Sequence, residues 1–442
     1  MENNRFIEKL LAKAKEETPA SNHYKFLKNN AITYLKDNGH PTQRHEDWLY
    51  TKLDTVFEVD WNLSPTTLSK ISNIDEIFRC DVPDLDTYRI FLFNGYLYPE
   101  YLPLPEGITI YSIKDLWQKN PTLLERYFFS IAPLNHPFNA INAAMLTDGY
   151  FLHIKKGARA DKPIQLINAS IGHVPFLINQ HNIILAEEGS EAQIIGCDHT
   201  LSPTKFFNNN ITEIHLESNA SLEYYSSQNT HNENNLFSSI YVEQLSHSRF
   251  YSNIITLHGG MIRNELHVNL NQSGTECSAY GLNLTDRKQH AESFTKIHHR
   301  APACKSFQYY KGIFDDDATG AFTGKIYVDK EAQKTEAYQS NKNLLLTPTT
   351  KVNSRPQLEI YADDVKCSHG ATTGQLDTNA LFYMQARGID RKEARMLLMY
   401  AFANEIVSKI KIQPLSHRIE SLVNHRLRGE LSRCANCVIK CE

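Results

Sequence analysis

The 442-residue chain is 41% hydrophobic and 22% charged, a composition that excludes a wholly disordered protein and predicts two or three domains. Lys and Arg total 46 against 50 Asp and Glu, for a net charge of −4, so no basic excess favours nucleic-acid binding. No apolar run reaches the length of a membrane span, and the start MENNRFIEKLL lacks an apolar signal core. We expect a cytoplasmic protein with neither a nucleic-acid nor a membrane partner.

Residues 1–125 are predicted to form a helical and mixed N-terminal region. Apolar residues recur at helical spacing over 6–14 and again over 26–35, with Ser21 as a potential N-cap and Gly39 as a stop. The segment that follows, GHPTQRHEDWLYTKL, is dense in charged and aromatic residues and shows no clear period.

Residues 126–376 are dominated by short alternating runs such as PIQLINAS, SLEYYSS and GKIYVD, which are typical of strands. Turn signals between these runs recur at intervals of about 27 to 31 residues, a spacing typical of repeat architectures. The turn markers are Gly189, Asn219, Ser246, Gly274, Pro302, Ala332 and Asp363. The pattern predicts a mainly β protein whose core is a parallel β-helix, with each rung stacked on the next. A β-sandwich with evenly spaced hairpins is the alternative.

Residues 377–442 are predicted to be helical again. Asp377 and Asp390 are potential N-caps, and Gly388 ends the first helix. We expect Pro414 to end the second helix, and the helices to cover the open end of the β-helix. The apolar face expected on the second helix comprises Ala394, Leu397, Leu398, Ala401, Phe402 and Ile406. The tail carries Cys434, Cys437 and Cys441, which supply three thiolates where structural zinc needs four ligands, so reactive thiols at a frayed end are the preferred interpretation.

Motifs for nucleotide chemistry are missing from the sequence. The nearest match to a phosphate-binding loop, GAFTGKI at 320–326, has one residue too few between its glycines and Ile where a Ser or Thr is needed. His298 and His299 are adjacent, so in a strand they point to opposite faces. The acidic run at 315–317 is interpreted as a solvated loop. We expect no ATP hydrolysis by this chain.

The sharpest local pattern is DDVKCSHGATTG, in which Cys367 and His369 are two residues apart. In a strand these side chains share one face, about 6.5–7 Å apart. A thiolate and a neutral imidazole suit iron or zinc, and a nearby His lowers the pKa of a thiol. Two donors do not complete a metal site, so the others would come from elsewhere or from a second chain. A buried Cys beside a surface His, with no metal role, stays open on spacing alone.

Three stretches together resemble the SufB/SufD family of iron–sulfur cluster assembly proteins. They are PTQRHEDWLYT, the strand-rich middle, and the C-terminal YADDVKCSHGATTGQLDTNALFYMQARGIDRKEARMLLMYAFANEI. The HEDW segment at 45–48, Gly370 after CSH and the lack of an N-terminal cysteine motif favour the SufD branch over SufB. The three-cysteine tail departs from the family pattern.

The resemblance implies a right-handed parallel β-helix in a complex of one SufB, one SufD and two copies of the ATPase SufC. It places SufB against the β-helix and SufC against the C-terminal helices, and it allows a homodimer when the chain is alone. Cys367 and His369 fall on positions implicated in cluster assembly at the SufB interface, where they would hold metal transiently with SufB. The residues expected to contact SufC are Leu381, Phe382, Arg387, Gly388, Ala394 and Leu398.

The resemblance also implies no cofactor in the isolated chain, and a transient cluster or iron in the complex. Reduced flavin is associated with the complex, although the sequence has no flavin motif. We therefore expect a non-catalytic scaffold subunit that supports iron acquisition and de novo cluster assembly, coupled to ATP hydrolysis by SufC. The competing interpretations are a polysaccharide-active β-helix enzyme, a plain assembly platform and the paralogous SufB scaffold. An enzyme would need a carboxylate pair, and the adjacent acids at 187–188 and 363–364 would point apart in strands.

Overall fold

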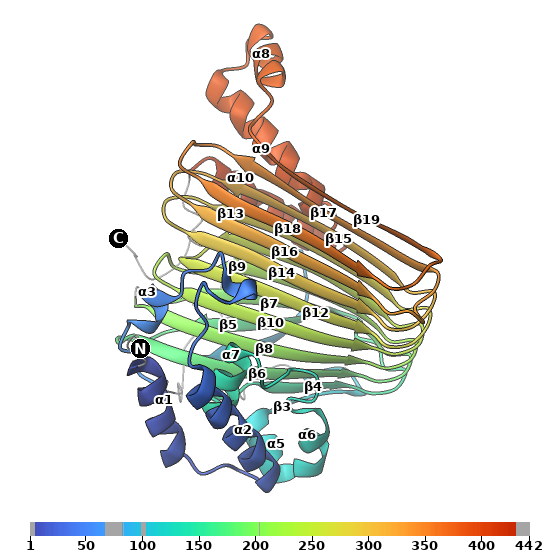
Figure 1. Ribbon diagram of the computed structural model, residues 1–442. Coiled ribbons are helices and arrows are strands. Elements are labelled where there is room, and N and C mark those ends of the chain that lie inside the picture. The colour runs from blue at the N-terminus through green and yellow to red at the C-terminus, as the bar shows by residue number, and fades with distance from the viewer. Residues whose placement is uncertain (1–4, 67–81, 83, 99–102, 203, 430–442) are drawn as a thin grey trace.

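The computed structural model describes residues 5–66, 82, 84–98, 103–202 and 204–429. In these ranges the protein is mainly β, with a parallel β-solenoid flanked by helices at both ends of the chain, which confirms the predicted fold class (Figure 1). From β4 onward, the even-numbered strands belong to one sheet and the odd-numbered strands to the other. Each turn of the coil therefore adds one strand to each sheet, and the two sheets enclose the core between them.

The first sheet, called sheet A, contains β3 Ile108–Ser112, β4 Tyr150–Ile154, β6 Phe176–Ala186, β8 Phe206–Leu216, β10 Asn235–Gln244, β12 Met261–Leu270, β14 His290–His299, β16 Thr319–Val328 and β18 Lys351–Ile360. Sheet B contains β1 Tyr88–Phe93, β2 Tyr96–Leu97, β5 Ile164–Ser170, β7 Glu191–Thr200, β9 Ser221–Asn229, β11 Arg249–His258, β13 Glu276–Thr285, β15 Lys305–Phe314, β17 Thr335–Leu345 and β19 Val365–Gly374. From β4 and β5 onward all pairings are parallel. The sheets begin before residue 126, because β1 pairs with β5 and β3 with β4.

The repeat length varies little along the coil. Paired residues are 26 positions apart between β10 and β12, where Asn235 meets Met261, and 32 apart between β16 and β18, where Thr319 meets Lys351. The turns that lead from sheet A to sheet B stack on one another. Each turn from the one between β6 and β7 to the one between β16 and β17 places one residue at positive φ, namely Gly189, Asn219, His247, Gly274, Ala303 and Lys334, whereas the turn between β18 and β19 places none. Three of the turn markers in the sequence, Gly189, Asn219 and Gly274, are themselves at this left-handed backbone position.

Ala303→Gly should stabilise the protein, because Ala303 has φ 56° at an exposed turn. The left-handed conformation costs a residue with a β-carbon roughly 1–2 kcal/mol, and glycine loses roughly 0.5–1 kcal/mol in chain entropy. We expect a net gain of about 0.5 kcal/mol in the free energy of unfolding, measured by denaturant titration. An equal or lower stability would show that the turn is not strained.

The solenoid lumen holds an apolar core made of inward-facing columns, in which residues from successive strands stack in register. In sheet B one such column contains Ala192, Leu222, Phe250 and Cys277, all of them buried in the central cluster. Because side chains alternate along a strand, every second residue of each strand faces this lumen. The direction of each later side chain can therefore be assigned from its register.

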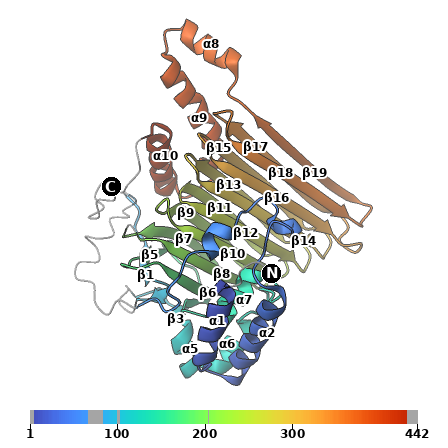
Figure 2. The ribbon, with the colours of Figure 1, turned by 60° about the vertical axis from the view of Figure 1, so that its left-hand side comes forward.

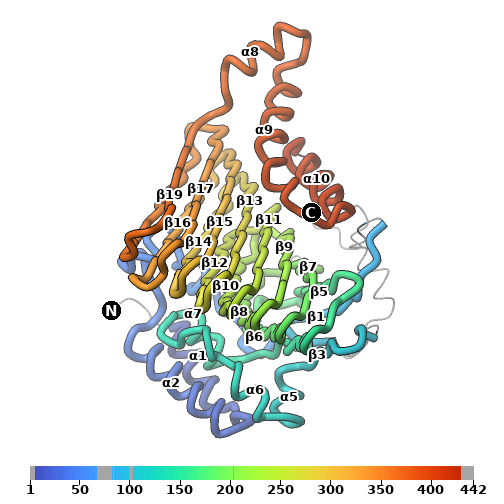
Figure 3. The backbone as a smooth tube through the Cα atoms, turned by 90° about the vertical axis from the view of Figure 1, so that its right-hand side faces the viewer, coloured from blue at the N-terminus to red at the C-terminus, as the bar shows by residue number. Residues whose placement is uncertain are grey.

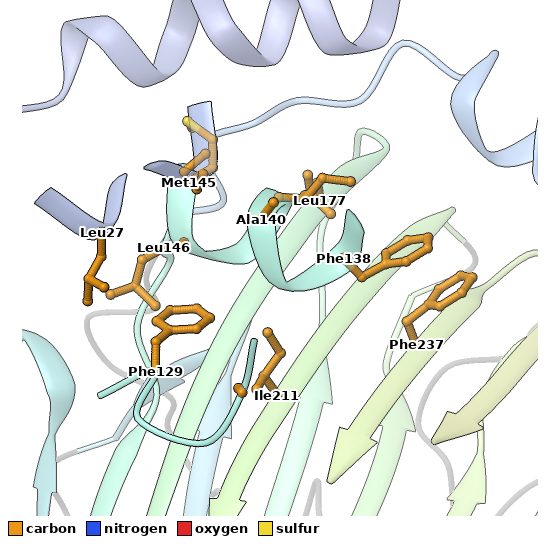
Figure 4. Close-up of a cluster of buried hydrophobic side chains, with 14 of the residues drawn as sticks. Leu27, Phe129, Phe138, Ala140, Met145, Leu146, Leu177, Ile211 and Phe237 are labelled. Carbon is orange, nitrogen blue, oxygen red and sulfur yellow. The ribbon is translucent and has the colours of Figure 1, made fainter. Parts of the chain in front are cut away.

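The N-terminal helices pack on the outer face of sheet A. They are α1 Arg5–Glu16, α2 Asn22–Asn38, the short η1 Glu46–Trp48, α3 Asp54–Phe57, α5 Ile113–Lys119, α6 Pro121–Tyr127 and α7 Pro137–Ala144. Ser21 is the N-cap of α2, accepting a hydrogen bond from the backbone N–H of Tyr24, as predicted. Phe138 of α7 stacks on Phe237 of β10 with ring centroids 3.9 Å apart (Figure 4). This apolar contact joins the helices to the solenoid.

Residues 46–51, called the strap, run along the outer face of sheet A (blue in Figure 2). The guanidinium of Arg263 on β12 lies 3.9 Å from the ring centre of Trp48, and Thr51 donates a hydrogen bond to Glu292 on β14. Asp47 pairs with Lys325 of β16 at 2.7 Å, and Glu46 pairs with Arg355 of β18. The strap therefore connects four consecutive strands of sheet A, and the charged and aromatic HEDW segment supplies the contacts to three of them.

The C-terminal helices are α8 Thr378–Ala386, α9 Arg391–Val407 and α10 Gln413–Leu427. The expectation that they cover the open end of the solenoid is wrong, because α9 contacts β13 and β15 and α10 contacts β11 on the outer face of sheet B (Figure 3). Pro414 stands in the first turn of α10 and does not end α9. No helix among the described residues is long and apolar enough to cross a membrane.

The face of α9 expected to be apolar is also partly wrong. Leu397 and Ala401 are exposed. The residues of α9 that are buried are Ala394, Met396, Met399, Ala403, Ile406 and Val407. The helix is apolar on nearly all sides, so spacing alone does not identify the face that meets the sheet.

The remaining motifs considered in the sequence have ordinary structural positions or lie outside the described residues. The sequence GAFTGKI lies inside β16, where no phosphate-binding loop can form. His299 faces the lumen, with Nε2 2.8 Å from the hydroxyl of Ser306, while His298 faces outward and lies 3.1 Å from Asp329. The acidic run at 315–317 is the turn between β15 and β16. Cys434, Cys437 and Cys441 lie outside the described residues.

Candidate functional site at the open end of the solenoid

The last rung of the solenoid exposes two strand edges. β18 and β19 are the terminal strands of sheets A and B, and within the described residues each pairs with one strand only, β16 and β17 respectively (Figure 2). The outer backbone N–H and C=O groups of these strands can pair with a strand from another chain. The edge is ten residues long on each side.

Cys367 and His369 both lie on β19, and the structure brings them to the same face of this edge strand. Cys367 is in register with Ala337 and His369 with Gln339, both buried residues of inward-facing columns. The two side chains are therefore at lumen positions of a rung that no further strand covers within the described residues. His369 is exposed, whereas Cys367 is half-buried against the small apolar cluster around Val328 and Ala337.

The pKa of the Cys367 thiol differs from the value expected from the sequence. Burial raises the pKa of Cys367, and the backbone hydrogen bond from Ala337 lowers it by less than burial raises it. The expected lowering by a neighbouring His is not observed. At neutral pH the group is a thiol, and a metal ion that binds it must displace its proton.

The two residues supply two donors for a metal ion. The described residues contain no group of three or more His, Cys, Asp or Glu side chains placed to hold a metal. A thiolate and an imidazole are soft and intermediate donors that suit iron or zinc, and a metal ion held by them would need further ligands from outside the described part of this chain.

The predicted ATPase-docking residues lie on the projecting pair α8–α9, beyond the end of sheet B (Figure 1). No residue of α8 is buried, and Phe382 and Tyr383 are 73% and 58% exposed. Arg387 lies 4.5 Å from the Tyr383 ring centre, and Gly388, at φ +82°, ends the helix. Leu381 and Leu398 are half-buried, so both offer surface to a partner, whereas Ala394 is fully buried and offers none.

A buried lysine joins α9 to the solenoid. The side chain of Lys311 on β15 is fully buried, and its ammonium donates to the backbone carbonyl of Phe402 at 3.0 Å and pairs with Glu405 at 2.8 Å. Burial lowers the pKa of Lys311, while the hydrogen bond and charge of Glu405 raise it. Sequence reasoning did not identify this residue, because a lysine in a strand gives no signal that it is buried.

Lys311→Met should loosen α9 from sheet B while leaving the solenoid folded. A hydrogen bond to a charged group is worth about 1.5–3 kcal/mol, and Met fills most of the lysine volume. We expect faster amide hydrogen exchange in α9, measured by mass spectrometry, with unchanged exchange in β6 to β12. Lys392→Met, on the exposed first turn of α9, is the control and should change nothing. Unchanged exchange in α9 of the Lys311 variant would contradict this role.

The carboxylate pairs considered for a polysaccharide-active site do not form one. Glu187 and Glu188 lie in the turn after β6, where Glu187 binds His153 at 2.8 Å and Glu188 binds Lys156 at 2.5 Å. Asp363 and Asp364 lie in the exposed turn between β18 and β19. Each glutamate therefore has a basic partner on a surface turn.

Two family models match the chain. The model described as the SufBD core domain of SUF system FeS cluster assembly matches residues 168–402, and that of the SufBD protein N-terminal region matches residues 8–166. The chain belongs to the SufBD family. The core match includes the solenoid from the end of β5 onward, both site residues and most of α9. The description of this model names iron–sulfur cluster assembly, and iron is a metal that a thiolate and an imidazole can bind.

Curated relatives of this SufBD protein resemble it over most of its length. The iron–sulfur cluster assembly protein SufD of Escherichia coli is 27% identical over 408 residues, which cover 90% of this chain and 92% of the relative. An iron–sulfur cluster assembly SufBD family protein of Synechocystis is 27% identical and covers 87% of both chains. SufD of Bacillus subtilis is 26% identical and covers 73% of this chain and 75% of the relative.

Proposed function

We propose that this SufBD protein is a non-catalytic scaffold subunit that supports iron acquisition and de novo cluster assembly at an interface with SufB. The observation that carries the proposal is the pair Cys367 and His369 on an edge strand whose outer side has no strand partner in the described residues. A second subunit that adds its own edge strand would cover both side chains and add further donors. The site is then a half-site that only an assembly completes.

Coupling to ATP hydrolysis by SufC would act through α8 and α9. The exposed aromatic residues Phe382 and Tyr383 offer apolar surface to a partner, and Lys311 fastens the other end of α9 to β15. A pull on α8 would therefore reach sheet B two strands from β19. ATP changes the interface only if SufC binds the two arrangements with different affinities.

The cofactor and localisation follow from the same proposal. The iron or cluster is cargo held transiently between two subunits, and the isolated chain, whether single or paired with a second copy, retains none. Reduced flavin would act on the assembly, since the sequence of this chain has no flavin motif. The assembly would work in the cytoplasm, with neither nucleic acid nor membrane as a partner.

Co-purification tests the proposal. The tagged chain is expressed alone and together with SufB and SufC, and the iron and acid-labile sulfide in each preparation are measured after anaerobic reconstitution. We expect a stable ternary assembly that holds iron and sulfide, and a chain alone that holds neither. A chain that binds neither partner, or that keeps the same iron and sulfide alone, would overturn the proposal.

The competing function as a polysaccharide-active enzyme has no supporting observation, because the two acid pairs lie in surface turns. Release of unsaturated or reducing sugars from polyuronates by the purified chain would favour it. A plain platform without chemical residues would show undiminished cluster yield when Cys367 and His369 are both replaced. The paralogous SufB role would require the chain to form the same assembly with SufD in place of SufB.

A further inference from the structure

Buried polar groups without partners gather in the lumen directly behind the open end. The column of sheet B that ends at His369 contains Ile164, Ile194, Tyr224, Ser252, Ala279, Gln308 and Gln339. Its first members and Ala279 belong to the central apolar cluster, so the whole column faces the lumen. Gln308 and Gln339 are 0% and 3% exposed. The column thus changes from apolar to polar as it approaches the site.

Neither glutamine amide has a hydrogen-bond partner within the described residues. The unpartnered atoms are Nε2 and Oε1 of both Gln308 and Gln339, together with the hydroxyl of Ser252 in the same column. A buried polar atom left unpaired costs roughly 1–3 kcal/mol, and native proteins satisfy such atoms with internal water. Four amide atoms in two adjacent strands are too many to leave unsatisfied.

The opposite wall of the lumen supplies another unpartnered group near the same place. A β-carbon on Gly324 of β16 would come within 2.2 Å of Gln339 Nε2, so the amide reaches across the lumen to this glycine. Thr295, the in-register neighbour of Gly324 on β14, is 1% exposed and its hydroxyl has no partner in the described part of the chain. Because adjacent strands are about 4.8 Å apart, one water can bridge the Gln339 amide and the Thr295 hydroxyl.

We propose that a file of buried water molecules occupies the lumen of the last rungs, bound by Ser252, Thr295, Gln308 and Gln339, and ends at His369. Ala279, between Ser252 and Gln308 in the column, is small enough to leave room beside both polar side chains. The last water gives the His369 ring a hydrogen-bond partner on its lumen side. That role for the ring rests on the proposed function, whereas the water file itself does not.

The thermodynamic test uses the sign of a stability change. Gln308→Met and Gln339→Met replace each amide with an apolar side chain of similar length. If water binds the amides, each variant leaves the remaining buried polar groups with fewer hydrogen-bond partners. The midpoint of thermal unfolding should then fall by at least about 2 °C. If no water binds the amides, removing these unpaired polar groups should raise the midpoint of thermal unfolding. A raised midpoint would overturn the proposal. Gln385→Met, on the exposed face of α8, is the matched control and should leave the midpoint unchanged.

Direct detection uses the isolated full chain labelled with [15N]glutamine. We expect nuclear Overhauser cross-peaks between long-lived water and the side-chain NH2 groups of Gln308 and Gln339. Their absence would refute the water file whatever the chain does in a complex. The last step is tested in the chain labelled with [15N]histidine, where Gln339→Met should change the 15N shifts of the His369 ring, while Ser368→Ala, outward on the same strand, should not. Water cross-peaks with an unchanged His369 ring would overturn only the link to the site.

Discussion

Replacing Arg263 with Met is expected to destabilise the protein by about 3–5 kcal/mol, because it removes the guanidinium that neutralises two buried carboxylates. Arg263 is 1% exposed, and its guanidinium lies 2.7 Å from Glu265 and 2.6 Å from Glu292, which are themselves 2% and 1% exposed. The same guanidinium stacks on Trp48 of the strap. Denaturant titration measures the loss, and proteolysis should cut the N-terminal region of the variant faster.

The control for the Arg263 variant also removes the negative charges of the two buried glutamates. Arg263→Met combined with Glu265→Gln and Glu292→Gln should recover much of the lost stability, since no unpaired charge remains in the interior. A single variant as stable as the parent, or a triple variant no better than the single one, would show that the ion pairs do not tie the strap to sheet A.

The same cluster predicts loss of stability in acid. Burial would raise the pKa of Glu265, but the charges of His136 and Arg263 hold it well below the ordinary value of 4.5. Burial also opposes the lowered pKa of Glu292, which Arg263 and His290 maintain. Each ionised carboxylate therefore contributes to the free energy of unfolding. Both contributions are fully present above pH 4.5 and are lost as the pH falls through the folded-state pKa values.

Replacing His369 with Ala is expected to impair cluster formation in the assembled complex while leaving the complex intact. The ring is exposed at the open end and contributes no core packing, so the free energy of unfolding should change by less than about 0.5 kcal/mol. Loss of one of two donors from this chain should reduce cluster yield at least about tenfold, in line with the effect of losing groups around a metal. Cluster absorbance and sulfide content measure the yield.

Ser368→Ala is the matched control for His369. Ser368 is the next residue on β19, is exposed and points to the outer face, in register with Tyr338. It should leave both complex formation and cluster yield unchanged. Normal cluster yield in the His369→Ala complex would defeat the assignment of this residue, and failure of that complex to assemble would indicate a structural role instead.

The period of the solenoid was predictable because its turns carry a regular signal, but several strands gave none. β17 carries Gln339, Asn341 and Asn343 at lumen positions and Glu336 and Lys342 on the outer face. Polar residues on both faces remove the alternation on which strand prediction depends. These polar residues lie next to β19, so the strand adjacent to the candidate site was the hardest to predict from the sequence.

The candidate site was predictable in part. The spacing of Cys367 and His369 placed both on one face of a strand, and β19 fulfils that expectation. Their position at the end of the solenoid, and the buried partners of the strap and of α9, depend on contacts between residues far apart in the sequence. Arg263 lies more than two hundred positions from Trp48, and no local pattern connects them.

The central claim is that a second subunit completes the open end of the solenoid and covers Cys367 and His369. Amide hydrogen exchange of β18 and β19, measured in the chain alone and after SufB is added, tests this most directly. The account predicts that both strands become strongly protected on complex formation, since their outer amides gain strand partners. A stable complex in which exchange of β18 and β19 stays unchanged, with protection elsewhere, would contradict it.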